Sequence, residues 1–250
     1  MKDYSIGKLT LGTPPRVVGI ISQRNSLPSA CPTGDYACDV VEVRLDAIGS
    51  DAKGWMKDCK AIEASGFPVI LTLRLANEGG KWNESDKKRE PILSAALENL
   101  GCIDVEFKSK LCVPLSRKAK KLGKCIIVSS HNFEFTPDFD DLKNILDRIL
   151  EIPCAIPKIS TMINKRADVV TLMRLLETAQ PRPVCIIGMG SKGTKSRILF
   201  PSVGSCLAYG YLDSPNAPGQ LSSSMLRKHL RQLLPVYNQD VIVRTPDRII

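Results

Sequence analysis

Short apolar runs alternate with stretches of helical periodicity along most of the chain. Between the runs, apolar residues recur at helical spacing in residues 55–64, 92–100, 141–150 and 168–177, and again at 223–234 after the last run. The runs are almost continuously apolar, as parallel strands covered on both faces are. They predict eight strands, at residues 17–21, 39–45, 68–74, 102–107, 124–131, 153–159, 182–188 and 204–209.

Eight strands joined by helical crossovers predict a single (β/α)8 barrel over residues 1–250. The 250 residues are 43% hydrophobic and only 5% aromatic, which suits one large aliphatic core. Two β-like runs at 6–11 and 16–21, separated by Gly-Thr-Pro-Pro, predict an N-terminal hairpin leading into the first buried strand. Pro157 has no N–H for a sheet ladder, so we expect the strand to be irregular or bulged there. Residues 238–250 match no element.

Polar residues end several of the predicted strands at two-residue spacing, which places each set on one face of its strand. In a parallel barrel these ends meet at one mouth, where the active sites of this architecture lie. A single pair could be a solvated strand end or a helix cap, but the recurrence favours a site. The sets are Glu42, Arg44 and Asp46; Thr72 and Arg74; Asp104 and Glu106; and Ser129 and His131.

Lys158 lies inside an apolar run of strand length, residues 152–160. A buried ammonium is costly to desolvate, so this lysine should be paired or discharged unless its stem carries the amine to water. Burial and nearby cations can keep a lysine unprotonated and therefore nucleophilic. Arg44, Arg74 and Arg197 are the candidate cations.

The chain has two histidines. His229 lies in the last predicted helix, where a solvated surface position is expected. His131 closes an apolar strand and should point into the mouth. A core histidine in a satisfied environment is the alternative, but beside a nucleophilic amine a general base is favoured.

The net charge of +9 and the pI of about 9.1 suit an anionic partner. The basic residues are dispersed and rarely interleave with aromatics, which argues against nucleic acid. No apolar run approaches the roughly 18 residues of a membrane span, and the N-terminus has no signal-like apolar region. We expect a soluble cytoplasmic protein.

The nine cysteines are odd in number, and none forms a Cys-x-x-Cys pair. Cys102, Cys125, Cys154 and Cys185 fall within predicted strands. These cysteines are expected to be small core residues in a reducing compartment.

Residues 188–193 match the dinucleotide-binding pattern Gly-x-Gly-x-x-Gly, with Asp213 at the distance of a ribose contact. After Gly193 the chain is too short for a Rossmann half, and Asp213 lies in a turn-rich loop. The better interpretation is that the backbone N–H groups of this glycine-rich segment and the side chain of Arg197 form an anion pocket for a carboxylate or phosphate. The turn-rich residues 212–220 are a candidate lid, with Gln220 able to bind a ligand.

Several motifs in register resemble type I 3-dehydroquinate dehydratase, from the first strand to the predicted lid. The motifs are Glu42-Val-Arg-Leu-Asp46, Thr72-Leu-Arg-Leu-Ala-Asn-Glu-Gly-Gly80, Asp104-Val-Glu106, Ser130-His131-Asn-Phe133, Lys158, Met189 to Arg197, and Ala217-Pro-Gly-Gln220. The resemblance implies a homodimeric (β/α)8 barrel that converts 3-dehydroquinate to 3-dehydroshikimate in the shikimate pathway, without a metal or a dissociable cofactor.

The same resemblance implies roles for individual residues. Lys158 would form a Schiff base with the substrate, His131 would transfer protons, and Glu106 would orient His131. Asn216 stands where the family commonly has serine, so one hydrogen bond of the lid could be rearranged. The implied substrate contacts are Glu42, Arg44, Arg74, Asp104, Asn216 and Gln220, with Arg197 clamping the carboxylate, Glu78 supporting the lysine and histidine, and Met189 and Tyr209 packing against the ring.

Two other functions fit part of the sequence. A class I aldolase or transaldolase uses the same barrel and lysine chemistry on phosphorylated substrates, although the Glu-Gly-Gly and Ala-Pro-Gly-Gln segments count against it. A basic α/β module that binds polyanions is the non-enzymatic alternative, and a steep salt dependence of nucleic-acid binding would support it.

Overall fold

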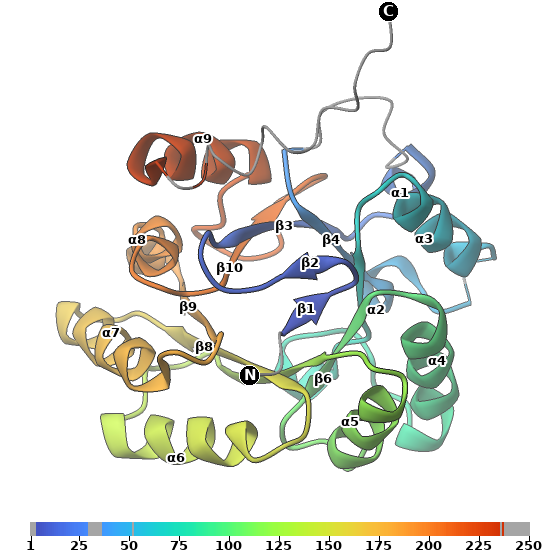
Figure 1. Ribbon diagram of the computed structural model, residues 1–250, viewed down its shortest axis with the longest axis horizontal. Helices are drawn as coiled ribbons and strands as arrows, with labels where there is room; N and C mark the ends of the chain where they lie inside the picture. The colour runs from blue at the N-terminus through green and yellow to red at the C-terminus, as the bar shows by residue number, and fades with distance from the viewer. Residues whose placement is uncertain (1–3, 30–36, 52, 236, 238–250) are drawn as a thin grey trace, which may run out of the picture.

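The computed structural model describes residues 4–29, 37–51, 53–235 and 237. Eight parallel strands form a nearly closed barrel with helices around it, as Figure 1 shows looking down the barrel. The strand order is β10-β3-β4-β5-β6-β7-β8-β9. The strands are β3 (Arg16–Ile21), β4 (Val40–Arg44), β5 (Val69–Thr72), β6 (Cys102–Glu106), β7 (Ile126–Asn132), β8 (Ala155–Met162), β9 (Cys185–Met189) and β10 (Leu207–Tyr211). The predicted (β/α)8 barrel is confirmed.

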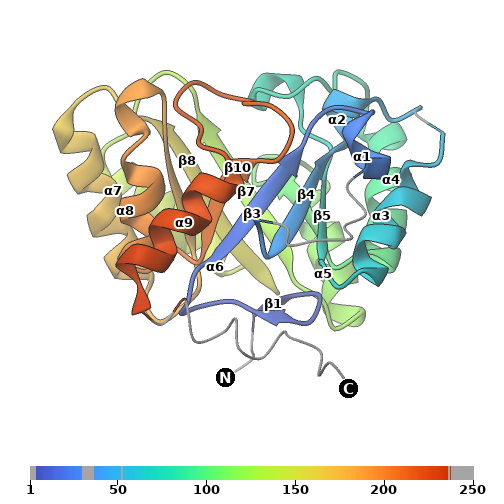
Figure 2. The same ribbon diagram turned by 90° about the horizontal axis from the view of Figure 1, so that it is seen from above.

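The N-terminal hairpin is confirmed but is tighter than the predicted one. Its strands are β1 (Ser5–Ile6) and β2 (Leu9–Thr10), and Gly7 adopts the positive φ of 55° that the turn requires. The 16–21 segment pairs with β10 and β4 inside the barrel, not with the hairpin. The hairpin lies across the amino-terminal end of the barrel, opposite the loop that follows β10 (Figure 2).

The helices confirm every predicted one and add others. The helices Cys112–Lys121 and Ser196–Ser202 escaped the periodicity criterion because Pro114 and Pro201 interrupt their patterns, and the helices Ser26–Ser29 and Leu45–Ile48 because four residues are too few to show a helical period. The helices are α1 (Ser26–Ser29), α2 (Leu45–Ile48), α3 (Trp55–Ala64), α4 (Asp86–Asn99), α5 (Cys112–Lys121), α6 (Phe139–Leu150), α7 (Arg166–Ala179), α8 (Ser196–Ser202) and α9 (Ser223–Leu233), with 3-10 turns η1 (Ala76–Glu78) and η2 (Ser191–Gly193).

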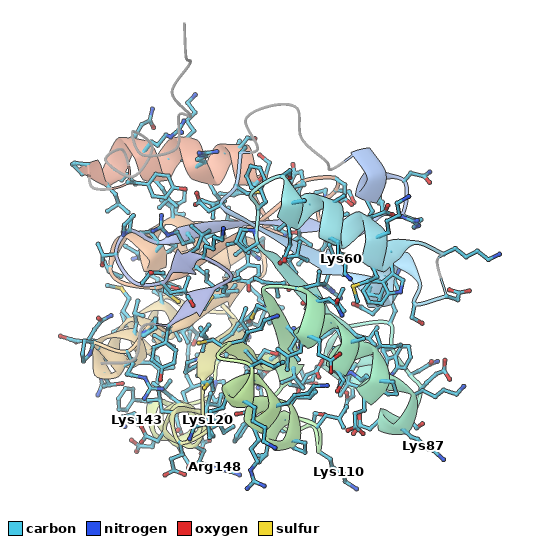
Figure 3. The ribbon with its side chains drawn as sticks, turned by 45° about the vertical axis from the view of Figure 1, so that its right-hand side comes forward. Lys60, Lys87, Lys110, Lys120, Lys143 and Arg148 are labelled. Atoms are coloured by element: carbon cyan, nitrogen blue, oxygen red, sulfur yellow. The ribbon has the colours of Figure 1, made fainter. Side chains whose placement is uncertain are left out.

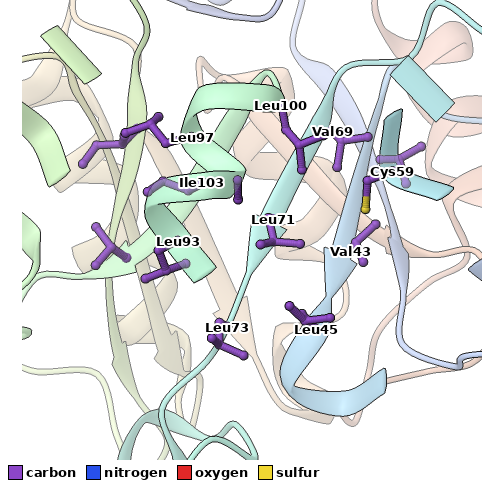
Figure 4. Packing of buried hydrophobic residues seen from close by; sticks show 14 of the residues in the cluster. Val43, Leu45, Cys59, Val69, Leu71, Leu73, Leu93, Leu97, Leu100 and Ile103 are labelled. Atoms are coloured by element: carbon purple, nitrogen blue, oxygen red, sulfur yellow. The ribbon is translucent and has the colours of Figure 1, made fainter. Parts of the chain in front are cut away.

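Apolar packing occupies both sides of the sheet. Outside the barrel, Leu93 and Leu97 of α4 pack toward Leu71 of β5 and Ile103 of β6 (Figure 4). Inside the barrel, a second apolar cluster fills the end nearest the hairpin and includes Ile6 of β1. Four of its members are the cysteines predicted to be core residues, all buried and, within the described part of the chain, none joined in a disulfide: Cys102, Cys125, Cys154 and Cys185.

The bulge expected at Pro157 is absent. β8 pairs with β7 in unbroken register across this position, from Ala155 to Thr161. The N–H of Ile163 donates to the carbonyl of Met189 in β9. Residues two apart along a parallel strand direct their N–H groups to the same neighbouring strand, so the backbone nitrogen of Pro157 also faces β9. Pairing with β9 begins only at Lys158, so the missing N–H of Pro157 breaks no ladder bond.

Basic side chains project from the outer helices and loops. Lys60, Lys87, Lys110, Lys120 and Arg148 are exposed and point away from the barrel (Figure 3). They come from several elements, in agreement with the dispersed charge of the sequence. Across the described ranges, every helix is too short or too polar to cross a bilayer.

Candidate active site

Lys158 lies in the middle of β8 with its amine inside the barrel, and only 5% of the residue is exposed. Its Nζ is 2.9 Å from Asp104 Oδ2 and 3.8 Å from Glu42 Oε1. The same nitrogen lies 4.2 Å from the centre of the Tyr209 ring. The amine is therefore paired with carboxylates, and the route to solvent along the apolar stem is not used.

Asp104 on β6 connects this lysine to Arg74. Arg74 Nη2 is 2.8 Å from Asp104 Oδ1, and Ser129 donates to the same carboxylate at 2.6 Å. Although burial acts in the opposite direction, Arg74 and Lys158 hold the pKa of Asp104 far below its usual range. Glu42 is fixed separately, by a 2.6 Å hydrogen bond from the Thr72 hydroxyl.

Glu106 lies two residues beyond Asp104 and is fully buried. It pairs with Arg74 Nη1 at 2.9 Å and accepts the Leu75 N–H at 3.1 Å. Its second oxygen pairs with Arg89 of α4, a residue that sequence reasoning did not select. The sequence does contain a signal for Arg89, since this arginine lies four residues before Leu93 and therefore on the apolar stripe of the helix.

His131 lies at the end of β7, one inward-facing position beyond Ser129, which pairs with Lys158 across the sheet. Its Nδ1 is 2.9 Å from Glu78 Oε2, and its side chain is 9% exposed. Burial lowers the pKa of His131 well below its ordinary value, and the positive charges of Arg74 and Lys158 lower it further. The imidazole is therefore neutral and available as a base.

The predicted contact between Glu106 and His131 is wrong. Within the described residues, the oxygens of Glu106 are held by Arg74, Leu75 and Arg89, and Glu78 takes the position beside the histidine. Burial raises the pKa of Glu78 to about 7, and the charges of Glu106 and Asp104 add to the rise against the opposing effect of Arg74. Near neutral pH the His131–Glu78 pair can therefore exchange a proton.

The Glu-Gly-Gly segment positions Glu78. Gly79 has a φ of +75°, and a Cβ on it would meet the Phe133 ring at 2.3 Å. A Cβ on Gly80 would lie 2.1 Å from the carbonyl oxygen of Arg74. Only glycines allow the loop to fold this closely over the strand end, which brings Glu78 to His131.

Arg197 enters the same region from α8 and is 7% exposed. Its guanidinium makes one long hydrogen bond, to the Tyr209 carbonyl at 3.5 Å, and among the described residues it meets no carboxylate. Burial lowers the pKa of Arg197 to about 10. A buried guanidinium that meets no protein carboxylate is suited to pair with a ligand carboxylate or phosphate. Tyr209 of β10 and Met189, the last residue of β9, are both buried.

The expected common face of Glu42, Arg44 and Asp46 is not formed. The chain turns into α2 directly after Arg44, so Asp46 lies on a helix. Arg44 forms a bidentate pair with Asp46, at 2.9 Å from Nε and 2.8 Å from Nη2. Of the three, only Glu42 contacts Lys158.

The predicted lid, residues 212–220, is tied to the rim of the barrel. Asp213, excluded above as a ribose ligand, accepts the backbone N–H groups of Ser22 and Gln23, both at 2.7 Å. Gln220 Oε1 accepts the Asn216 N–H at 2.7 Å, so these two predicted ligand contacts meet each other. A Cβ on Gly219 would lie 2.5 Å from the Gly190 carbonyl, which places the loop against the glycine-rich segment before Arg197.

The site thus brings together an amine, a neutral imidazole with a carboxylate partner, and a buried guanidinium that meets no carboxylate of the described residues. The amine can form an imine with a ketone, and the imidazole can move a proton at a neighbouring carbon. The guanidinium can hold an acidic group of the same small ligand.

Comparisons with known proteins agree with this chemistry. The chain is 34% identical over 220 residues to the 3-dehydroquinate dehydratase of Methanocella arvoryzae, covering 88% of this chain and 97% of the relative. Its fold is similar to the dehydratase structures from Clostridium difficile (TM-score 0.83, 24% identity, 93% and 98% of the two chains) and Aquifex aeolicus (0.77, 27%, 87% and 98%). The sequence model described as type I 3-dehydroquinase matches residues 20–235. The chain belongs to the type I 3-dehydroquinase family.

Proposed function

We propose that this enzyme dehydrates 3-dehydroquinate to 3-dehydroshikimate, a step of the shikimate pathway, through a Schiff base on Lys158. The observation that carries the proposal is the buried Lys158 amine in a barrel that also contains the neutral His131 and the anion-free Arg197. Membership in a lyase family supports the reaction class.

The imine solves the chemical problem of the reaction. Elimination of water beside a ketone requires removal of a weakly acidic C–H proton. The Lys158 amine attacks the ketone carbon, and loss of one water gives a protonated imine that accepts the electrons of the broken C–H bond. The resulting enamine expels the neighbouring hydroxyl, and a further water hydrolyses the imine to release the product and the free amine.

His131 is proposed to move the protons. Its Nδ1 faces Glu78, which leaves Nε2 to take the C–H proton and to return it to the departing hydroxyl. Ionised Glu78 would stabilise the imidazolium formed between these two steps. This assignment replaces Glu106 with Glu78 as the partner of His131, and it leaves Glu106 the task of holding Arg74.

The remaining predicted contacts are proposed to bind the substrate. Glu42, Asp104 and Arg74 line the interior around the amine and would meet ring hydroxyls. Gln220 and Asn216 would do so by exchanging their mutual hydrogen bond for bonds to the ligand. Arg44 would bind substrate while held by Asp46, and Met189 and Tyr209 would pack against the ring.

Replacing Arg197 by methionine should raise the KM for 3-dehydroquinate by about 100-fold with a smaller effect on kcat, because a charge-assisted bond to the carboxylate is lost in the ground state and the transition state alike. Steady-state kinetics measure the split. Arg197→Lys keeps the positive charge and should raise the KM less than Arg197→Met does. An unchanged KM in the methionine variant would show that the carboxylate binds elsewhere.

The direct test of the proposed function is trapping with borohydride. Protein incubated with 3-dehydroquinate and borohydride should carry the ligand as a reduced secondary amine on a peptide containing Lys158, found by mass spectrometry. The same protein without borohydride should form 3-dehydroshikimate, followed by ultraviolet absorbance. Turnover with an unmodified Lys158 would contradict the Schiff-base assignment, and absence of turnover would contradict the reaction.

The homodimer, the cytoplasmic location and the single domain over residues 1–250 stay predictions.

A further inference from the structure

Arg89 is the largest fully buried side chain of the described residues, with 0% of its surface exposed. It lies on α4, outside the barrel, on the stripe that continues with Leu93 and Leu97. Those two leucines pack against the sheet (Figure 4), so apolar packing alone would place another aliphatic residue at position 89. A permanent charge here requires compensation.

The compensation comes from the site. Arg89 Nη2 pairs with Glu106, Nε donates to the Leu73 carbonyl at 3.0 Å, and Nη1 lies 3.8 Å from the half-buried Asp86 and 3.5 Å from the Ser109 hydroxyl. Glu106 in turn holds Arg74, Arg74 holds Asp104, and Asp104 holds Lys158. One continuous chain of ion pairs therefore runs from the outer helix to the reactive amine.

The buried members of this chain of ion pairs balance in number. They are the carboxylates of Glu42, Asp104 and Glu106 and the basic groups of Arg74, Arg89 and Lys158, while the half-buried Asp86 lies at the solvent side of Arg89. Without Arg89, the group would carry one uncompensated negative charge. Arg74 would then be the only side chain neutralising Glu106, and it would do so at the expense of Asp104.

We propose that Arg89 is a positioning residue that neutralises Glu106 from outside the barrel, so that Arg74 stays on Asp104 and no surplus negative charge is left beside the Lys158 amine. This role rests on the proposed function. Arg89 lies on α4, outside the barrel, and it meets the site through its ion pair with Glu106. Its effect on the reaction therefore passes through Arg74 and Asp104.

Replacing Arg89 should act on the amine more than on substrate binding. Excess negative charge stabilises the ammonium, so the free amine forms only at higher pH. The groups that face Lys158 are Asp104, Glu42 and Tyr209 by contact, and Arg74, His131 and Cys185 through their charges. None of these residues is altered in an Arg89 variant.

The test compares the pH dependence of kcat/KM and of the borohydride-trapping rate in four variants. Arg89→Met should move the acid limb of both profiles up by about one pH unit and lower kcat near pH 7 about 10-fold or more, with KM within about threefold of wild type. Arg89→Lys keeps the positive charge but lacks the planar guanidinium group, and its acid limb should lie close to that of wild type. The double variant Arg89→Met, Glu106→Gln removes one charge of each sign and should also restore the wild-type acid limb.

Leu93→Ala is the matched structural control. It lies on the same stripe of the same helix, is equally buried, and should lower the melting temperature by leaving a cavity while the acid limb stays in place. A shift of the acid limb in Leu93→Ala equal to that in Arg89→Met would reduce Arg89 to a packing role.

The outcomes separate this role from the function itself. A wild-type protein without turnover or trapping refutes the proposed reaction. An active wild type with an unshifted acid limb in Arg89→Met refutes only the role of Arg89. If Arg89→Met does not fold, Arg89→Lys and the double variant provide the test. The acid limb of the pH profile must lie near that of wild type in both variants. A shift of the acid limb in either variant contradicts the proposed charge balance.

Discussion

Replacing Lys158 by methionine should reduce turnover of 3-dehydroquinate by about 10⁴-fold or more, because the variant keeps the length of the side chain and removes the nucleophile. The fold should survive. Asp104 loses one partner but keeps Arg74 at 2.8 Å and the Ser129 hydroxyl at 2.6 Å, so its carboxylate does not become an unpaired buried charge. Circular dichroism and steady-state kinetics check the two expectations together.

A surface lysine provides the control for this substitution. Lys143 pairs with Asp147 on the outside of α6, and Lys143→Met should leave turnover and trapping unchanged. If Lys158→Met were still trapped by borohydride, another amine would be the nucleophile. Appreciable remaining turnover would show that the reaction proceeds without an imine.

Replacing His131 by alanine should lower kcat by about 10³- to 10⁴-fold, the range expected when a positioned general base is lost. Imine formation should remain measurable, because the amine and its carboxylate partners Asp104 and Glu42 are untouched. Borohydride trapping in the variant should therefore still label Lys158. Single-turnover measurements separate the slow elimination from the earlier step.

Glu78→Gln is the companion variant for His131. It keeps a hydrogen bond to Nδ1 but cannot carry a negative charge, so it should lose less activity than His131→Ala. Equal loss of trapping and turnover in His131→Ala would show that the histidine acts on imine formation, not on the C–H proton. A Glu78→Gln variant as active as wild type would remove Glu78 from the mechanism.

The strand ends were predictable because parallel strands and their polar residues obey a local rule. Lys158 in an apolar run, His131 after another, and Asp104 on a third are visible as exceptions to hydrophobic patterning. Parallel pairing then brings every carboxyl end to the same mouth, whatever the exact register. The barrel and the members of its central site follow from that rule.

The pairing within the site was not predictable in the same way. Glu106 and Glu78 were both candidates for His131, and the choice depends on how η1 folds over the strand ends through Gly79 and Gly80. Arg44 was expected to share a strand face with Asp46, but the chain turns into α2 after Arg44, and the two residues form an ion pair. Each of these contacts depends on the path of a loop or turn, and such segments have no hydrophobic periodicity from which their path can be predicted.

The order of apolar and polar positions by itself predicted the barrel, because continuous apolar runs alternate with stretches of helical periodicity, and it identified Lys158 and His131 as polar exceptions in those runs. Arg197 was predicted separately, from the glycine-rich segment that precedes it. Only the tertiary structure decided which charges neutralise one another. Arg89 reaches Glu106 from a helix on the far side of the sheet. Such a contact depends on the packing of α4 against β6, and no spacing along the chain encodes it.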